Sequence, residues 1–372
     1  MIKLENVTKI YADGTRAVDD VNLEVNEGEI CVFLGPSGCG KTTTMKMINR
    51  LIPITSGKIL INGVDNTKLK PSELRRDIGY AIQEIGLFTH MTVGQNIETV
   101  PVLKGWSKEK RRARAEELLE LVRLNPADYI DKYPAELSGG QRQRVGVARA
   151  LGADPPILLM DEPFGAIDPI NRLELQTEFL KIQEKIQKTI IFVTHDIYEA
   201  IKMGDRIALM KDGKLEQYDT PANILYHPKD KFVEGFVGAD RALKGLQLLR
   251  VKDVMNRDVV TVTADDSTDV ARERLDKTAG ESLAVVTGSG AFTGWISKEG
   301  LEKAGAVSDT MEKSTVAAEE NSVLNEALSL MLSSRFKSLP VIDGKGRLKG
   351  ILTIDTIQEA LHEAIADREA GA

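Results

Sequence analysis

The residues with the clearest chemistry form a glycine-rich run at positions 35–43, directly after an apolar run at 30–34. A strand, a glycine-rich turn and a helix, in this order, are the setting of a phosphate-binding loop. Gly38 and Gly40 allow backbone N–H groups to face phosphate oxygens. The run therefore predicts a nucleotide site made by these residues: Gly35, Pro36, Ser37, Gly38, Cys39, Gly40, Lys41, Thr42 and Thr43.

Charged and hydroxyl side chains give this predicted site the means to hydrolyse a nucleoside triphosphate. Lys41 is expected to reach the β and γ phosphates, and the Thr42 hydroxyl is expected to coordinate Mg²⁺. A second apolar run, at 157–160, ends in the adjacent carboxylates Asp161 and Glu162. We expect Asp161 to hold the Mg²⁺, directly or through water, and Glu162 to orient the attacking water or take its proton.

A third motif, Leu-Ser-Gly-Gly-Gln at 137–141, offers a hydroxyl and bare backbone N–H groups at the start of a predicted helix. Such a helix start is suited to binding an anion. The anion need not belong to the same subunit and can be supplied by another one.

The elements that must position these groups follow from the hydrophobic pattern. The runs at 30–34, 157–160 and 190–193 are continuously apolar, as expected of central strands covered on both faces. Short β-rich runs alternate with helical stretches over the first 240 residues, and this alternation predicts a mostly parallel α/β core.

Two helical segments are predicted beside this core. Charged residues and leucines recur at helical spacing from 107 to 122, which predicts a helical subdomain ahead of the Ser138 motif. A second helix, near 231–237, is expected to close the domain. The basic residues of the first segment are interpreted as a solvated helix face: Lys108, Lys110, Arg111, Arg112 and Arg114.

Composition narrows the classes of protein. A length of 372 residues suits two or three domains. A formal net charge of −7 does not favour a nucleic-acid binder, whose affinity depends on Lys and Arg. The two cysteines, Cys31 and Cys39, are expected to be free thiols in a reducing compartment. No signal peptide is recognised and no apolar run approaches the roughly 18 residues of a membrane span, so any membrane role is expected to go through a partner.

The C-terminal part contains an internal repeat. The segment around Asp253 matches the segment around Asp309, 56 positions later, and two further segments match at the same offset without gaps. Each copy is predicted to form a strand, a helix, two strands and a helix.

From Ile2 to about Gly238 the chain resembles ATP-binding-cassette (ABC) proteins, on the strength of the phosphate-binding loop, the Asp161-Glu162 pair and the Ser138 motif. The resemblance implies a dimer with two ATP molecules between its halves. It assigns contacts with the ATP of the other subunit to Ser138, Gly139, Gly140, Gln141 and Asp168.

The same resemblance implies roles for three further residues. Tyr11 is expected to stack on adenine, beside a predicted turn at 13–14. Gln83 is expected to sense the γ-phosphate and Mg²⁺, and His195 to contact the γ-phosphate. The segment 84–96 resembles the surface on which the coupling helix of a transporter sits.

The repeat resembles a tandem pair of cystathionine-β-synthase (CBS) domains. The predicted fold is therefore an α/β phosphate-loop ABC ATPase domain with a helical subdomain, followed by an α+β CBS pair. The expected boundaries are 1–240 for the ATPase domain, 241–250 for a linker, 251–306 for the first CBS copy and 307–372 for the second. CBS pairs can hold adenine nucleotides between their copies, or serve only in packing or dimerisation.

Three functions are open to such an ATPase. The first is a transporter subunit; the stretches 45–51 and 83–88, with the CBS tail, resemble the ATPase subunits of bacterial importers for glycine betaine, carnitine, choline or proline betaine. Another small solute is an alternative cargo. The second is a soluble ABC ATPase of DNA repair or translation, but the chain lacks the long coiled-coil insertion or second cassette of those proteins. The third is a nucleotide sensor without coupled work, against which Glu162 argues.

An importer subunit implies three protein partners: a second copy of the chain, an integral membrane permease and, through the permease, an extracytoplasmic substrate-binding protein. Its place is the cytoplasmic face of the bacterial membrane, as a peripheral protein. For the CBS pair, the second copy has Thr353 but carries Thr356 where an acid usually holds ribose, and the first copy lacks the acid. Cyclic di-AMP, another adenine nucleotide or ionic strength are the candidate signals.

Overall fold

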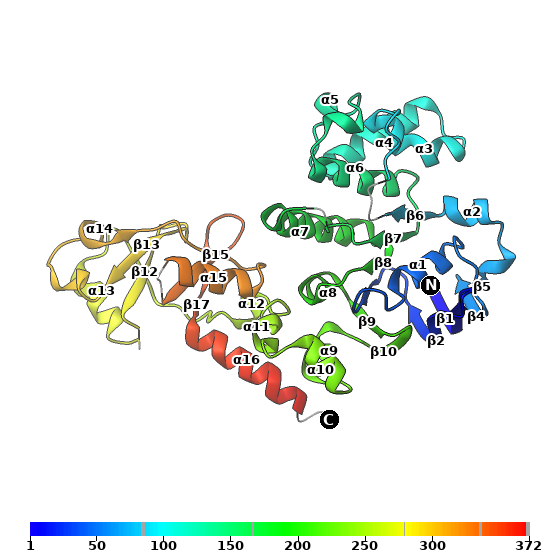
Figure 1. Ribbon diagram of the computed structural model, residues 1–372. Coiled ribbons are helices and arrows are strands. Elements are labelled where there is room, and N and C mark those ends of the chain that lie inside the picture. Colours follow the sequence, from blue (N-terminus) through cyan, green and yellow to red (C-terminus); the bar gives the residue numbers. More distant parts are fainter. Residues whose placement is uncertain (83–85, 166, 279, 335–336, 370–372) are drawn as a thin grey trace. The chain divides into compact units, whose positions relative to one another are not determined.

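The computed structural model describes residues 1–82, 86–165, 167–278, 280–334 and 337–369. The chain divides into two compact units, Met1–Gly238 and Ala239–Ala372 (Figure 1). Gln83, expected to sense the γ-phosphate, lies outside the described residues.

The larger sheet of the first unit consists of β3 (Ile30–Leu34), β6 (Ile78–Ala81), β7 (Ile157–Asp161), β8 (Thr189–Val193), β9 (Arg206–Lys211) and β10 (Lys214–Asp219). Their order is β10-β9-β3-β8-β7-β6, and all neighbours are parallel except β10 and β9. Every residue of β3, β7 and β8 is buried. This confirms the prediction that the continuously apolar runs form central strands.

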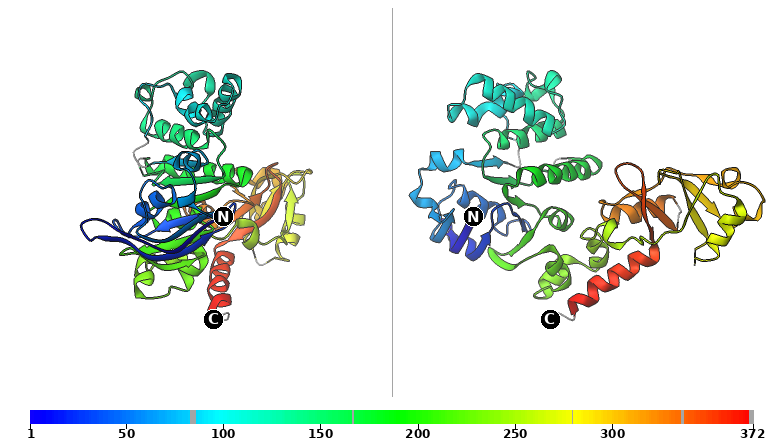
Figure 2. Two further views of the ribbon diagram at one scale, coloured as in Figure 1. Left: turned by 90° about the vertical axis from the view of Figure 1, so that its right-hand side faces the viewer. Right: turned by 180° about the vertical axis from the view of Figure 1, so that it is seen from behind.

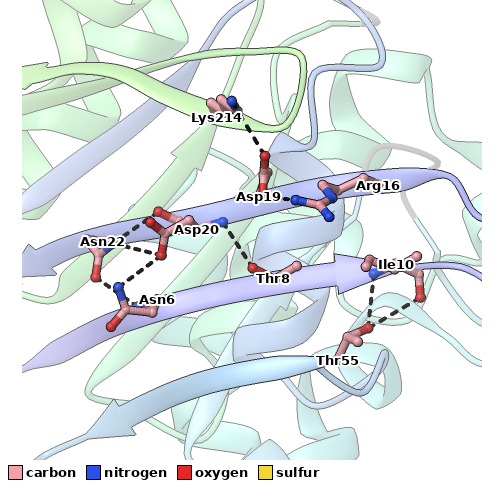
Figure 3. A network of polar contacts seen from close by, with 9 residues as sticks. All are labelled: Asn6, Thr8, Ile10, Arg16, Asp19, Asp20, Asn22, Thr55 and Lys214. Atoms are coloured by element: carbon pink, nitrogen blue, oxygen red, sulfur yellow. Dashed lines mark hydrogen bonds and ion pairs between the residues drawn. The ribbon is translucent and has the colours of Figure 1, made fainter.

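The smaller, antiparallel sheet of this unit consists of β1 (Ile2–Ile10), β2 (Arg16–Val25), β4 (Ser56–Ile61) and β5 (Val64–Asp65), in the order β2-β1-β4-β5. Its alternate side chains share a core with β3, β7 and β8. The pairing of β1 with β2 is irregular after Leu4, and polar side chains replace the interrupted backbone ladder there (Figure 3).

Asn6 and Asp20 stand at these irregular positions with φ angles of 50° and 53°. The Asn6 N–H donates to the Asn22 side-chain oxygen at 2.8 Å, and the Asp20 N–H donates to the Thr8 hydroxyl at 3.0 Å. Asn and Asp tolerate the left-handed region better than other residues with a side chain. The bulged strands therefore keep their backbone donors satisfied.

The described part of the first unit also contains ten α-helices: α1 (Lys41–Ile48), α2 (Pro71–Arg76), α3 (Val93–Leu103), α4 (Lys108–Leu121), α5 (Pro126–Tyr129), α6 (Gly139–Leu151), α7 (Pro169–Ile186), α8 (Ile197–Met203), α9 (Pro221–Tyr226) and α10 (Lys231–Val237). Helices α3 to α6 lie together as a helical subdomain at one end of the unit (Figures 1 and 2). The subdomain was expected from the helical spacing at 107–122, and α10 corresponds to the helix expected near 231–237.

The second unit contains two sheets built from the two repeat copies. Its elements are α11 (Arg241–Gly245), α12 (Val251–Val254), β11 (Thr261–Thr263), α13 (Thr268–Leu275), β12 (Ser282–Val286), β13 (Phe292–Ser297), α14 (Val307–Thr310), β14 (Glu312–Lys313), β15 (Ala318–Glu319), α15 (Leu324–Ser334), β16 (Ser338–Ile342), β17 (Leu348–Thr353) and α16 (Ile354–Glu369). The sheets have the orders β11-β12-β13-β14 and β15-β16-β17.

The two copies repeat one pairing register. Val285 lies opposite Gly294, and Val341 lies opposite Gly350, at the offset of 56 positions read from the sequence. The first copy departs from the predicted plan, because a short 3-10 helix at Gly300–Glu302 stands where a closing helix was expected.

The opening residues of each copy pack against the other copy. Val251 and Met255, which begin the first copy, belong to the core built around β16, β17 and α15. Val307, which begins the second copy, is buried in the core built around β12 and β13, with Met311 packed against that core. Each of the two cores is therefore completed by residues from both copies.

The segment expected to be a linker is partly structured. It contains α11, and Leu246 is fully buried in the core that holds Met255. Because Leu246 is buried in the core of the second unit, this segment packs as part of that unit.

Candidate active site

The phosphate-binding loop joins β3 to α1. At Gly35, with φ +145°, a Cβ atom would lie 2.2 Å from the Met210 carbonyl oxygen, and at Gly40 it would lie 2.4 Å from the Ala17 carbonyl oxygen. Only glycine fits at these two positions. At Gly38, with φ +79°, a Cβ atom would meet nothing within 4 Å. The loop is packed tightly at its ends and open in its middle, as a phosphate cradle requires.

The Lys41 ammonium lies inside the curve of this loop. It donates to the Gly35 carbonyl at 2.7 Å and to the Pro36 carbonyl at 2.9 Å, and the residue is only 6% exposed. Pro36 and Ser37 are exposed, whereas Cys39 is a buried free thiol. Lys41 thus holds a positive charge inside the loop that is expected to bind the phosphates.

Thr42 and Asp161 meet at the base of the loop, although 119 residues separate them in sequence. The Thr42 hydroxyl donates to Asp161 Oδ1 at 3.0 Å. Burial raises the pKa of Asp161, and the Thr42 hydrogen bond opposes that shift. A hydroxyl and a carboxylate in contact are the oxygen ligands that Mg²⁺ prefers, so these two residues fit the metal. Thr43, the next residue, is half-buried.

Glu162 and His195 lie at the ends of the neighbouring strands β7 and β8. Glu162 Oε1 is 3.0 Å from His195 Nδ1, and the His195 side chain is 65% exposed. Glu162 adopts φ 45°, an unusual conformation for a non-glycine residue, and its N–H donates to the Val193 carbonyl at 3.0 Å. Backbone strain of this kind often marks functional positions. The sequence predicted both residues but not their contact.

The Ser138 motif forms the start of α6. Ser138 Oγ accepts a hydrogen bond from the Gln141 N–H at 3.3 Å, and Gln141 Oε1 accepts one from the Ser138 N–H at 2.9 Å. This is a capping box, which satisfies two donors at the helix start. At Gly139 and Gly140 a Cβ atom would meet nothing within 4 Å. The glycines therefore leave the helix start open to an outside group.

The remaining predicted residues stand at exposed positions. Tyr11 is 39% exposed after the end of β1, next to a turn in which the Gly14 N–H donates to the Tyr11 carbonyl at 3.0 Å. Asp168 is exposed, and its carbonyl accepts from the Arg172 N–H at 2.9 Å at the start of α7. Glu199, a buried acid on α8, was not predicted from the sequence; its only signal is a carboxylate among the apolar residues of that helix.

A groove of about 300 Å³ lies between the helical subdomain and the larger sheet. Asn49, Phe88 and three arginines line it: Arg75, Arg76 and Arg149. Burial lowers the pKa of Arg149. The Asn49 side-chain oxygen is buried without a hydrogen-bond partner in the described part of the chain. The groove thus combines clustered positive charge with an unused acceptor.

Comparison with known proteins bears directly on this site. The ABC transporter family model matches residues 18–165, a span that includes the phosphate-binding loop, the capping box at Ser138 and the Asp161-Glu162 pair. The CBS domain model matches residues 251–306 and 307–363. Over 370 residues the chain is 46% identical to a glycine betaine/carnitine/choline transport ATP-binding protein of Bacillus subtilis, covering 98% of this chain and 97% of that protein.

The chain belongs to the family of ABC transporter ATP-binding proteins. It is an ABC ATPase with a tandem CBS pair, as the sequence predicted. A carnitine transport ATP-binding protein of Listeria monocytogenes is 47% identical over 370 residues, covering 98% and 93% of the two chains. An osmoprotectant import ATP-binding protein of Salmonella typhimurium is 45% identical over 368 residues, covering 97% and 96%.

Solved structures agree with the first unit of this ABC protein. A dimeric bacterial ABC transporter cassette is 39% identical, with a TM-score of 0.55, and covers 59% of this chain and 99% of that one. A dimeric cassette bound to ADP and phosphate is 38% identical with the same TM-score and coverage. None of the helices that the structure describes is both long enough and apolar enough to cross a bilayer.

Proposed function

We propose that this protein is the ATPase subunit of a bacterial importer for quaternary-amine osmoprotectants such as glycine betaine, carnitine and choline. The observation that carries the proposal is identity of 45–47% with proteins named for such transport, over at least 97% of this chain and including both CBS copies. The cargo of such importers is expected to meet the binding protein and the permease, so another small solute is the alternative.

ATP and Mg²⁺ fit the residues of the site. The backbone donors of loop 35–43 and the Lys41 ammonium bind the phosphates, while Thr42 and Asp161 hold the metal with oxygen atoms. When bound, Mg²⁺ neutralises charge that develops on the phosphates. We assign Tyr11 to the adenine and Gln83 to the γ-phosphate and the metal.

Glu162 and His195 supply the proton chemistry of hydrolysis. Glu162 Oε1 lies 3.0 Å from His195 Nδ1, within reach of a hydrogen bond that an Nδ1–H would donate to the carboxylate. That contact fixes the direction of the carboxylate, which then accepts a proton from the attacking water.

A second copy of the chain completes each ATP site. The open helix start at Ser138, Gly139, Gly140 and Gln141 carries the partial positive charge of α6, which suits a γ-phosphate held by the partner. Asp168, on an exposed loop, contacts the partner beside it. The dimeric assemblies of the two similar cassettes support this arrangement.

The arginine-lined groove receives a membrane permease. A short segment of the permease that brings acceptors to Arg75, Arg76 or Arg149 would pair with the positive charge of the groove. The protein would then act at the cytoplasmic face of the membrane, and an extracytoplasmic binding protein would deliver substrate to the permease.

Transport in reconstituted vesicles tests the cargo. With its permease and binding protein, the chain should support ATP-dependent uptake of radiolabelled glycine betaine, carnitine or choline, and the Lys41→Ala variant should lose that uptake. A neutral sugar of similar size serves as the control solute. ATP-dependent uptake of another solute, with none of the three amines transported, would favour the alternative.

We propose that the CBS pair regulates this ATPase in response to cyclic di-AMP, another adenine nucleotide or ionic strength. In the second copy the Thr356 hydroxyl bonds to Thr353, with the Thr353 N–H donating to it at 3.0 Å, and Asp355 is exposed. The position where an acid would hold ribose is thus occupied by a hydroxyl engaged within the chain. Titrating the second unit alone, from Ala239 onward, with AMP, ATP and cyclic di-AMP distinguishes the nucleotides, because the full protein also binds ATP at the phosphate-binding loop.

Removal of the second unit should preserve transport and abolish its regulation. The cut belongs after Gly238, where the first unit ends, because Leu246 packs into the second. A regulatory shift of about 1–3 kcal/mol changes activity roughly 5- to 150-fold. Uptake by full-length and truncated complexes is compared across a salt series, with and without cyclic di-AMP. An identical response of the two complexes would place the sensor in the permease and leave the CBS pair a bracing module.

A further inference from the structure

A buried carboxylate joins two elements behind His195. Glu199 Oε2 accepts a hydrogen bond from the Thr194 hydroxyl at 2.6 Å, and Glu199 Oε1 accepts one from Gln176 Nε2 at 3.0 Å. The exposed fractions are 7% for Glu199 and 1% for each of the other two residues. Glu199 therefore ties the end of β8 to the middle of α7, away from solvent that would weaken the tie.

Thr194, which donates to Glu199, also stabilises the turn that contains His195. The Thr194 hydroxyl accepts from the Asp196 N–H at 3.0 Å, and Asp196 Oδ1 accepts from the Tyr198 N–H at 2.8 Å. His195 is held between Thr194 and Asp196. Its imidazole can face Glu162 only while the turn keeps this shape.

The α7 end of the tie leads to the loop that carries Asp168. Arg172, one helical turn before Gln176, donates from Nη2 to the Ile167 carbonyl at 3.0 Å. Arg172 Nε and Gln176 Oε1 are buried without hydrogen-bond partners in the described part of the chain. One is a donor and the other an acceptor, so each has a hydrogen bond still to make on this face of α7.

We propose that Glu199 is a positioning residue for ATP hydrolysis, which holds the His195 turn against α7 and so makes the contact between His195 and Glu162 depend on the position of α7. The inference rests on the proposed roles of His195 and Asp168. Because α7 begins at the loop proposed to meet the partner subunit, closure of the dimer would reach His195 through this carboxylate.

Substitutions of Glu199 test the proposal by their effect on steady-state ATP hydrolysis. E199A removes both hydrogen bonds and should lower kcat roughly 10- to 100-fold, as misplacement of a reacting group does, with KM for ATP within about twofold of wild type. E199Q should restore most of the activity, because its carbonyl accepts from Thr194 and its amide can donate to Gln176 Oε1. E184A changes an exposed glutamate of the same α7 and should have no effect.

Two further measurements separate positioning from general damage. H195A and the double variant H195A/E199A should have the same kcat, because Glu199 acts through His195. Hydrogen exchange of the nucleotide-free protein should be faster at 194–200 in E199A, but not in E199Q or E184A. Additive losses in the double variant, or unchanged exchange in E199A, would overturn the proposal. Full turnover by H195A would instead remove the proposed role of His195 itself.

Discussion

The Glu162→Gln variant is expected to bind ATP with normal affinity and to hydrolyse it roughly 10²–10⁴ times more slowly than wild type, the usual contribution of a positioned general base. Gln keeps the size of the side chain and an oxygen that accepts from His195 Nδ1, at the position now 3.0 Å away. It loses the basicity needed to accept a proton from water. The change therefore isolates the proton-transfer role of Glu162 from its place in the fold.

Two measurements check this expectation. ATP binding is followed by equilibrium titration, and turnover is measured in the presence of the permease. Because ATP remains unhydrolysed between the subunits, size-exclusion chromatography with ATP should show a dimer that ADP does not support. E184Q provides a matched control, since Glu184 is exposed on α7. Unchanged turnover in E162Q would remove Glu162 from the mechanism.

The Ser138→Arg homodimer is expected to lose hydrolysis almost completely. The long cationic side chain would fill the open space above Gly139 and Gly140, where a Cβ atom meets nothing within 4 Å. It also removes the cap of α6, which costs about 1 kcal/mol of stability. The Ser107→Arg variant matches that secondary effect, because Ser107 caps α4 by accepting from the Lys110 N–H at 3.3 Å. S107R should remain active.

Mixed dimers test whether Ser138 contacts the ATP bound by its own subunit or by the partner subunit. A Lys41→Ala chain combined with a Ser138→Arg chain places both defects in one composite site and leaves the other intact, whereas each homodimer has two defective sites. Hydrolysis should therefore reappear on mixing. Full activity of the S138R homodimer would contradict a site shared between subunits.

Local sequence was enough to predict the parts of the fold that depend on neighbouring residues. The buried strands β3, β7 and β8 are continuous apolar runs, and the turn after β3 contains glycines at positions where a Cβ atom would collide with Met210 or Ala17. The 56-residue offset predicted that the two copies repeat the same elements, and β12–β13 and β16–β17 pair in the same register at that offset.

Features that depend on distant packing were not predictable in the same way. The contact of Glu162 with His195 requires that β7 and β8 be neighbours in the correct register. The role of Glu199 requires Gln176 on another helix, and no local pattern connects the two. The role predicted for Gln83 rests on the family resemblance alone, because this residue lies outside the described residues.

The exchange of opening segments between the CBS copies determines the order in which this unit can form during synthesis. The core around β12 and β13 is complete once Met311 has been made, shortly after its own strands. Val251 and Met255, although synthesised earlier, belong to a core that is completed only when Leu352 and Ile357 have emerged. A ribosome that stops between the copies therefore releases a chain in which Val251 and Met255 lack the apolar side chains of the second copy that bury them.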